Sequence, residues 1–174
     1  MTETEQSTGA LAFTDIAGFT EFTATRGDAA ALSLLDRQEE LVRIALPEGS
    51  RIVKSLGDGL MLWFPQATAA LVAGVELRGT FERCADAEFP LWVRMGMHWG
   101  TPTARRGDLF GHDVNLAARI TELAGPGELL VSEPLCTAAV PPVGVHLEEL
   151  GPVVMRGIPE PVPLFRAFRE VASA

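Results

Sequence analysis

The stretch LAFTDIAGFTEF, residues 11–22, places one carboxylate, Asp15, between an apolar run and a turn at Gly18. The apolar run predicts a buried β-strand over residues 10–16 that breaks at Gly18. A carboxylate at the end of such a strand costs several kcal/mol to desolvate unless a cation or hydrogen-bond donors compensate it. An aspartate that caps the following turn would also explain Asp15, so its role depends on what the rest of the chain places beside it.

A second aspartate, Asp58, lies at the centre of RIVKSLGDGLMLWF, residues 51–64. Two β-rich runs around Gly-Asp-Gly are typical of a tight hairpin, so Asp58 is expected at its tip. If the strands of Asp15 and Asp58 are neighbours, their carboxylates can bind two Mg²⁺ or Mn²⁺ ions. The chain has three histidines and no cysteine cluster, which disfavours zinc.

The turn after Asp15 offers further ligands for a charged group. Ile16 supplies a backbone carbonyl, and Gly18, Phe19 and Thr20 supply free N–H groups where a short helix is expected to begin. Such a helix start suits a metal-bound triphosphate. The turn and the two aspartates together outline a nucleotide site.

The remaining pattern alternates helices and strands. A helix is predicted over residues 28–46 with Asp28 as its N-cap, and a second over 66–85, whose small residues suggest close packing on a sheet. A third helix is predicted over 111–127, ending at Gly-Pro-Gly, and further strands over 90–100, 128–132, 145–150 and 162–168. Helices packed on a mostly antiparallel sheet give an α+β fold class.

Length and composition bound the remaining possibilities. The 174 residues, 47% of them hydrophobic, predict one domain over residues 9–170 between flexible tails at 1–8 and 171–174. There is no apolar run of about 20 residues, the N-terminus is acidic, and the chain has two cysteines, so we expect a cytoplasmic protein without a membrane segment. Acidic residues outnumber basic ones 23 to 14, which argues against a nucleic-acid partner.

Four segments, FTDIAGFT, KSLGDGLM, VRMGMHWG and DLFGHDVNLAARI, resemble the successive signature segments of the class III nucleotidyl cyclases, in the family's order. The resemblance covers roughly residues 9–168. It implies a ferredoxin-like βαββαβ core with additional strands and helices, and a head-to-tail homodimer with two composite active sites. It also implies ATP as the substrate and two Mg²⁺ or Mn²⁺ ions per active site.

The resemblance also assigns roles to residues. One chain would bind both metal ions through Asp15, Asp58 and the Ile16 carbonyl, while the second chain would meet the purine with Lys54 and Asp108. Adenine presents an amino donor and a bare ring nitrogen as acceptor, which complement an aspartate and a lysine. Guanine reverses this pattern, so ATP is expected over GTP.

Two further pairs complete the implied site. Asn115 and Arg119 lie four residues apart, on one face of the predicted helix, and would meet the ribose and the reacting phosphate from the second chain. Arg94 and Arg156 resemble the basic residues that bind the triphosphate. Arg156 stands where the family usually has lysine, which keeps the charge and changes the geometry of a phosphate contact.

Alternative functions are a catalytically silent nucleotide-binding or dimerisation module, a guanylate cyclase, and a metal-dependent phosphohydrolase built on the two aspartates. A silent module should lack at least one of six main site residues, and here all six have the expected types. The six are Asp15, Lys54, Asp58, Asp108, Asn115 and Arg119. His98 is expected in the core of a strand and His112 at a helix start, neither with a catalytic role. Trp92, Trp99 and Phe110 are expected to pack in the sheet or at the dimer contact.

Overall fold

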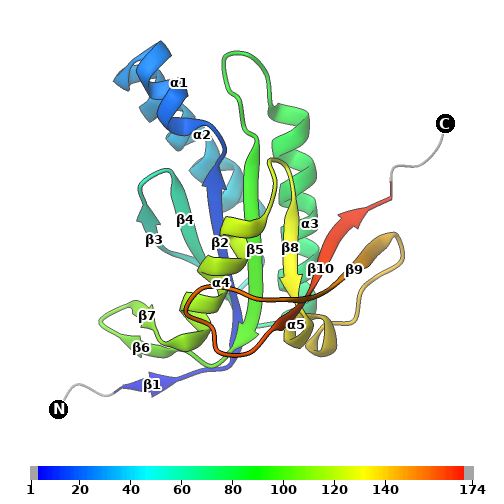
Figure 1. The fold of residues 1–174 in the computed structure, drawn as a ribbon. Coiled ribbons are helices and arrows are strands. Elements are labelled where there is room, and N and C mark those ends of the chain that lie inside the picture. The colour runs from blue at the N-terminus through cyan, green and yellow to red at the C-terminus, as the bar shows by residue number, and fades with distance from the viewer. Residues whose placement is uncertain (1–3, 171–174) are drawn as a thin grey trace.

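The computed structural model describes residues 4–170, in which helices pack on a mainly antiparallel sheet in an α+β arrangement (Figure 1). The strands are β1 (Glu5–Gln6), β2 (Gly9–Ile16), β3 (Arg51–Leu56), β4 (Gly59–Phe64), β5 (Val93–Gly100), β6 (Thr103–Arg105), β7 (Asp108–Phe110), β8 (Leu129–Ser132), β9 (Val145–Val153) and β10 (Val162–Arg169). The helices are α1 (Phe19–Arg26), α2 (Asp28–Ala45), α3 (Ala67–Cys84), α4 (His112–Leu123) and α5 (Glu133–Ala138). Across residues 4–170, none of the helices is long and apolar enough to cross a bilayer.

Seven strands form the main sheet in the order β3-β4-β2-β5-β8-β10-β9. Neighbours are antiparallel except β5 and β8, which run parallel. The order β3-β4-β2-β5, with α1 and α2 after β2 and α3 after β4, is that of a ferredoxin-like βαββαβ core, as predicted. The strands β1, β6 and β7 form a separate small sheet at the N-terminal end of the molecule (Figure 1).

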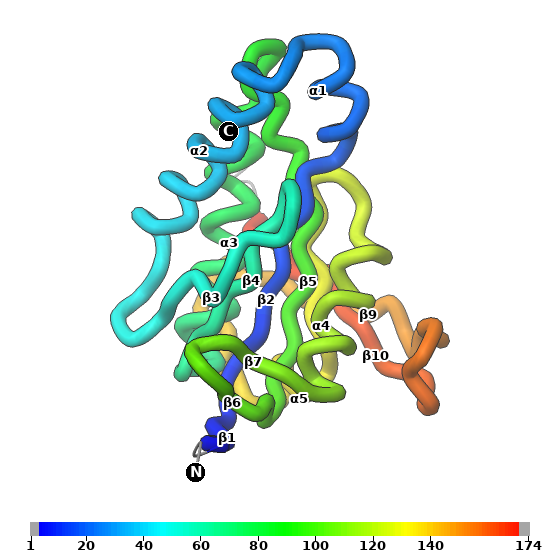
Figure 2. The backbone as a smooth tube through the Cα atoms, turned by 90° about the vertical axis from the view of Figure 1, so that its left-hand side faces the viewer, coloured from blue at the N-terminus to red at the C-terminus, as the bar shows by residue number. Residues whose placement is uncertain are grey.

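Side chains of β2 alternate between two hydrophobic layers. Ala10 and Ala12 pack in the cluster that contains the buried residues of α2 and α3, whereas Leu11 and Phe13 pack in a cluster with Ala117 of α4. Figure 2 shows α2 and α3 on one side of β2 and β5, and α4 on the other. Because the period of a strand is two residues, Asp15 shares the α4 side with Leu11 and Phe13.

Glycines let the helices approach the sheet closely. A Cβ at Gly96 of β5 would overlap the backbone N and side-chain Oγ1 of Thr121 on α4, and a Cβ at Gly100 would overlap Asp113. On the other side, a Cβ at Gly74 of α3 would crowd Met97 of β5. The close packing predicted for the helix over residues 66–85 is therefore present in α3. The contact between α4 and β5 also depends on glycines.

Several local predictions need correction. Asp28 is the first residue of α2 and makes no capping hydrogen bond, because Gly27, with φ 86°, occupies the cap and turns the chain directly out of α1. The strand predicted from residue 90 begins at Val93, and the helix predicted over 111–127 is shorter, because α4 ends before Gly-Pro-Gly. Glu5 and Gln6, inside the predicted N-terminal tail, form β1, and residues 1–3 and 171–174 lie outside the described part of the chain.

Candidate active site

The two aspartates come together at one end of the sheet. β2 pairs with β4 in the register Thr14 to Leu60, which places the turn at Asp58 beside the end of β2. Gly57, with φ 61°, provides the left-handed conformation that this tight turn requires. Burial, and next the negative charge of Asp15, raise the pKa of Asp58 above its ordinary value. A carboxylate whose charge is disfavoured by a second carboxylate beside it is suited to share a divalent cation with that neighbour.

The charge opposite Asp15 is Arg94. The two residues are cross-strand partners on β2 and β5, and Arg94 Nη1 donates a hydrogen bond to Asp15 Oδ2 at 2.9 Å. Both residues line a cavity of about 310 Å³ together with Gly59 and, on the α4 side, Thr121 and Glu122. Arg94 is thus within reach of whatever the two aspartates bind.

The backbone after Asp15 has the conformation that the sequence suggested. Gly18, with φ 73°, ends the turn and α1 begins at Phe19, so the first N–H groups of α1 have no partners within the helix. Within residues 4–170 no three His, Cys, Asp or Glu side chains are grouped to hold a metal. Two carboxylates and the Ile16 carbonyl would leave coordination positions for water and phosphate oxygens, as Mg²⁺ and Mn²⁺ prefer.

Lys54 and Asp108 form an ion pair. Lys54 Nζ lies 2.7 Å from Asp108 Oδ2, which joins β3 to β7 across 54 residues of sequence. The hydrogen bond from Lys54 lowers the pKa of Asp108, and the backbone N–H of Leu109 donates to its other oxygen at 2.8 Å. Phe110, which is exposed, places its ring 5.7 Å from Lys54 Nζ. A donor and an acceptor are therefore fixed side by side on the surface.

Asn115, Arg119 and Arg156 line a second cavity, of about 400 Å³. Arg119 Nη1 donates to both carboxylate oxygens of Glu122, at 2.8 and 2.9 Å. Sequence reasoning missed Glu122: a glutamate three residues after an arginine on a helix is a common surface pair, and nothing in the pattern sets this one apart.

Five of the predicted site residues line two cavities, while Asp58, Lys54 and Asp108 line neither of the two. The first contains Asp15 and Arg94, the second contains Asn115, Arg119 and Arg156, and they share Ala118 and Glu122 of α4. Asn115 and Arg119 line the second cavity and are not among the residues that line the first. One chain thus presents two different partial sites on either side of one helix.

The sequence matches the adenylate and guanylate cyclase catalytic domain family over residues 1–165. The chain belongs to this family. A protein of Mycobacterium tuberculosis named pH-sensitive adenylate cyclase is 32% identical over 162 residues, which are 91% of this chain and 40% of that protein. The cyclase domain therefore spans about two fifths of the length of such curated relatives.

Solved structures show the same fold. The crystal structure of the adenylyl cyclase CyaB from P. aeruginosa is 24% identical, with a TM-score of 0.81 over 99% of both chains. The guanylyl cyclase Cya2 is 20% identical, with a TM-score of 0.82 over 96% of this chain and 94% of that one. An adenylyl and a guanylyl cyclase match about equally well, so the fold is compatible with either adenine or guanine as the base of the nucleotide.

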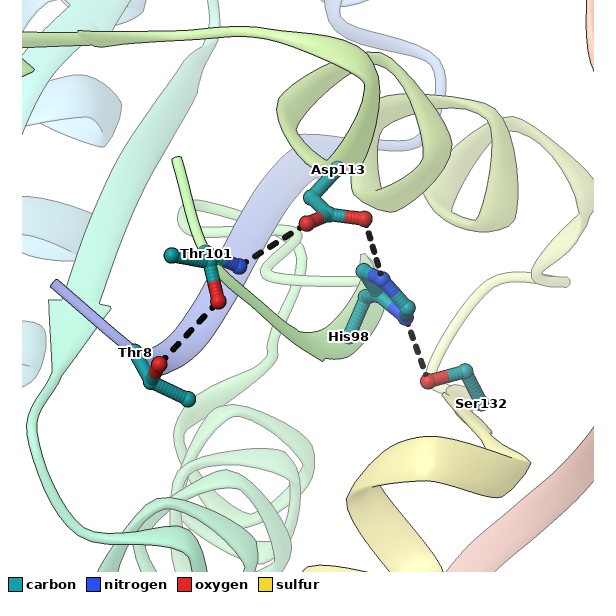
Figure 3. A network of polar contacts seen from close by, with 5 residues as sticks. All are labelled: Thr8, His98, Thr101, Asp113 and Ser132. Atoms are coloured by element: carbon teal, nitrogen blue, oxygen red, sulfur yellow. Dashed lines mark hydrogen bonds and ion pairs between the residues drawn. The ribbon is translucent and has the colours of Figure 1, made fainter. Parts of the chain in front are cut away.

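The cyclase domain also holds α4 to the sheet through a polar network (Figure 3). Asp113, in the first turn of α4, contacts His98 Nε2 at 3.0 Å and accepts a hydrogen bond from the backbone N–H of Thr101 at 2.8 Å. His98 Nδ1 lies 2.7 Å from Ser132 Oγ. This Ser-His-Asp order resembles that of a hydrolase, but Ser132 is 0% exposed and cannot reach a substrate.

The environment of His98 agrees with the role predicted for it. His98 is buried on β5, and burial lowers its pKa, so the neutral ring bridges β8 and α4 at neutral pH. His112 is the first residue of α4, also as predicted. What the sequence did not reveal is that His98 and Asp113 tie the start of α4, and with it Asn115, to β5.

Proposed function

We propose that the chain is an adenylate cyclase that converts ATP to 3',5'-cyclic AMP and pyrophosphate in two composite sites of a homodimer. The observation that carries this proposal is that Asp15 and Arg94 line one cavity of the chain, whereas Asn115, Arg119 and Arg156 line another. A head-to-tail pair would bring the first cavity of each chain against the second cavity of the other. Each composite site would then contain the aspartates of one chain and Asn115 and Arg119 of the other.

The aspartate side of the site would hold the metal-bound triphosphate. Two Mg²⁺ or Mn²⁺ ions on Asp15, Asp58 and the Ile16 carbonyl would lower the pKa of the ribose 3'-hydroxyl and neutralise charge on the phosphates. The N–H groups at the start of α1, Gly18 to Thr20, would bind phosphate oxygens. Arg94 would exchange Asp15 for the triphosphate, which keeps its guanidinium paired throughout.

The other side would orient the ribose and stabilise charge at the reacting phosphorus. Asn115 is exposed on α4 and is free to hydrogen-bond the ribose. Arg119 would leave Glu122 for the α-phosphate, where its guanidinium stabilises the charge that develops in the transition state. A half-exposed pair such as Arg119–Glu122 is worth about 0–1 kcal/mol, so this exchange is cheap. Arg156, exposed in the same cavity, would bind the departing pyrophosphate.

Base selectivity would come from Lys54 and Asp108. In the free chain the lysine donor and the aspartate acceptor satisfy each other at 2.7 Å. Adenine can insert between them because it offers an acceptor to Lys54 and a donor to Asp108. Guanine would place like groups opposite both residues, and unpaired polar groups in a closed site cost about 1–3 kcal/mol each.

The deciding assay incubates the purified protein with ATP or GTP and either metal, and measures cyclic nucleotide, pyrophosphate and inorganic phosphate. We expect cyclic AMP and pyrophosphate in equal amounts from ATP, and little product from GTP. Inorganic phosphate from ATP would instead indicate a phosphohydrolase, and cyclic GMP a guanylate cyclase. Nucleotide binding without any product would indicate a silent module.

The shared site has its own test, in which a chain with Asp15→Ala is mixed with a chain with Asn115→Ala. Each mutant homodimer has two broken sites, whereas a mixed dimer has one intact site. Random pairing makes half of the dimers mixed, so about a quarter of the wild-type specific activity should return. If mixed dimers form, as shown by mass spectrometry, and stay inactive, the composite site is wrong.

A further inference from the structure

We propose that Gln38 and Thr14 are positioning residues that hold the Asp58 turn at its place beside Asp15. The inference rests on the proposed function, because it assigns these residues to the metal-binding side of that site. Gln38 lies outside the sequence segments that resemble the cyclases, whereas Thr14 lies inside FTDIAGFT, directly before Asp15.

Gln38 is a polar side chain in the middle of the buried stripe of α2. It is 1% exposed, and its helix neighbours on that stripe include Leu34, Leu41 and Val42. A buried amide is costly unless both of its ends are hydrogen-bonded. Gln38 Oε1 accepts from Thr14 Oγ1 at 2.8 Å, and Nε2 donates to the backbone carbonyl of Asp58 at 3.1 Å.

The direction of these hydrogen bonds is fixed by their two ends. The Leu60 N–H can only donate, and it donates to Thr14 Oγ1 at 3.0 Å. The Asp58 carbonyl can only accept, so the amide nitrogen of Gln38 must face it. Thr14 therefore gives its proton to Gln38 Oε1. The result is one relay, Leu60 to Thr14 to Gln38 to Asp58, that clasps the chain on both sides of Gly59.

This clasp acts where the backbone is weakly restrained. Glycines flank Asp58 on both sides, so the backbone of this turn has little conformational restraint of its own. Gly59 is pressed so closely on β2 that a Cβ there would overlap the Thr14 carbonyl oxygen. Thr14 points toward α2 while the next residue, Asp15, points toward α4. The relay therefore ties the Asp58 turn to the residue adjacent to Asp15.

The main test replaces Gln38 by Met, which keeps the length of the side chain and removes both hydrogen bonds. The control is Val42→Ala, which removes buried volume from the same helix and touches no polar group. Mn²⁺ affinity is measured on the full chain without nucleotide, from the rise in Tm with MnCl₂ concentration. Residues that orient metal ligands typically contribute 10–100-fold in affinity, so we expect at least about a tenfold loss in Gln38→Met and none in Val42→Ala.

A second pair of variants decides the matter if Gln38→Met does not fold. Thr14→Ser keeps the hydroxyl, whereas Thr14→Val keeps the shape and removes it. We expect Thr14→Ser to bind Mn²⁺ as the wild type does and Thr14→Val to bind about tenfold more weakly. Equal affinities in wild type, Gln38→Met and Thr14→Val would overturn the proposal, and so would a wild-type chain that shows no Mn²⁺-dependent shift.

The two proposals fail differently. A wild type that binds Mn²⁺ and forms no cyclic nucleotide overturns the proposed function, while the affinities of the variants still decide the role of Gln38. A wild type that forms cyclic AMP with unchanged Mn²⁺ dependence in the variants overturns the positioning role alone. In active variants, the Mn²⁺ concentration for half-maximal rate should rise in parallel with the dissociation constant.

Discussion

Asp58 occupies a position that its own charge disfavours. Burial and the charge of Asp15 both raise its pKa, so the ionised form is destabilised in the folded chain relative to the unfolded one. The folded state then binds more protons than the unfolded state between the two pKa values, and stability falls as the pH rises through the raised pKa. At neutral pH the full penalty remains, and metal binding is what would relieve it.

This conflict predicts that Asp58→Asn stabilises the metal-free chain at neutral pH and abolishes its stabilisation by Mn²⁺. The gain should be at most about 1 kcal/mol, because the site is partly exposed and screened. It corresponds to a rise in Tm of about 2–4 °C. Thermal unfolding at pH 7 and near pH 3 checks this, since the difference between variant and wild type should shrink at the acid pH. A lower Tm at pH 7 would contradict it.

The same raised pKa predicts how Mn²⁺ binding responds to acid. The metal binds the ionised carboxylate, so the apparent affinity should fall as the pH drops through the pKa of Asp58, which is raised above its ordinary value. The Tm shift caused by Mn²⁺, measured at a series of pH values from about 4 to about 7.5, gives this pH dependence of the affinity. If the affinity for Mn²⁺ does not change over that pH interval, Asp58 is not a ligand.

Lys54 offers a test of base recognition that leaves the fold intact. The Lys54–Asp108 pair is partly exposed, so Lys54→Glu should change the free energy of unfolding by about 1 kcal/mol or less. It should lower kcat/KM for ATP at least tenfold, about 1.4 kcal/mol, because the donor to adenine is lost and a like charge faces Asp108. The matched control is Arg43→Glu on the exposed face of α2, which should leave kcat/KM unchanged. Equal effects of both variants would remove the assignment.

At the scale of elements, α4 depends on two glycines of β5. Gly96→Ala would force the Thr121 region of α4 away from the sheet, which should cost about 1–3 kcal/mol of stability. Asn115 and Arg119 belong to α4 and would move with it. Since their proposed roles are in the reaction step, kcat should fall by a larger factor than KM changes. Gly125→Ala is the control, since a Cβ there meets Glu128 only at an ordinary 3.5 Å. Unfolding and steady-state kinetics of both variants check this, and a Gly96→Ala enzyme with normal kcat would contradict it.

Elements long enough to show a regular apolar spacing were predictable from the sequence. α2, α3 and the β3–β4 hairpin have the apolar spacing and turn residues expected of them, because burial on one face dictates the pattern. The three-residue strands β6 and β7 are too short to show a period, and they form because they pair with each other and β6 also pairs with β1. The prediction of Asp28 as the N-cap was wrong because Gly27, with its positive φ, occupies the cap position.

The candidate site could be predicted only in part. The strand end and the hairpin tip indicated Asp15 and Asp58, and the cyclase resemblance supplied Lys54, Asp108, Asn115 and Arg119. Gln38 was visible as a glutamine in an apolar stripe, but its partner Asp58 lies 20 residues away and is contacted only in the folded chain. The pairing of Arg94 with Asp15 depends on the register of β2 with β5, which no local pattern sets.

For the whole molecule, the composite site predicts that activity depends on protein concentration. If each site needs two chains, the specific activity should fall on dilution below the dimer dissociation constant. Sedimentation or light scattering over the same concentration range should show dissociation in parallel with the loss. Specific activity that stays constant when the chain is monomeric would contradict the homodimer.

Because α4 borders both cavities through Ala118 and Glu122, each α4 of a symmetric pair would form a wall of both reaction chambers. A nucleotide that draws Arg119 away from Glu122 in one chamber frees a carboxylate that lines the other. The two chambers would then communicate, and substrate saturation would depart from a hyperbola. Glu122→Gln should move the Hill coefficient toward one.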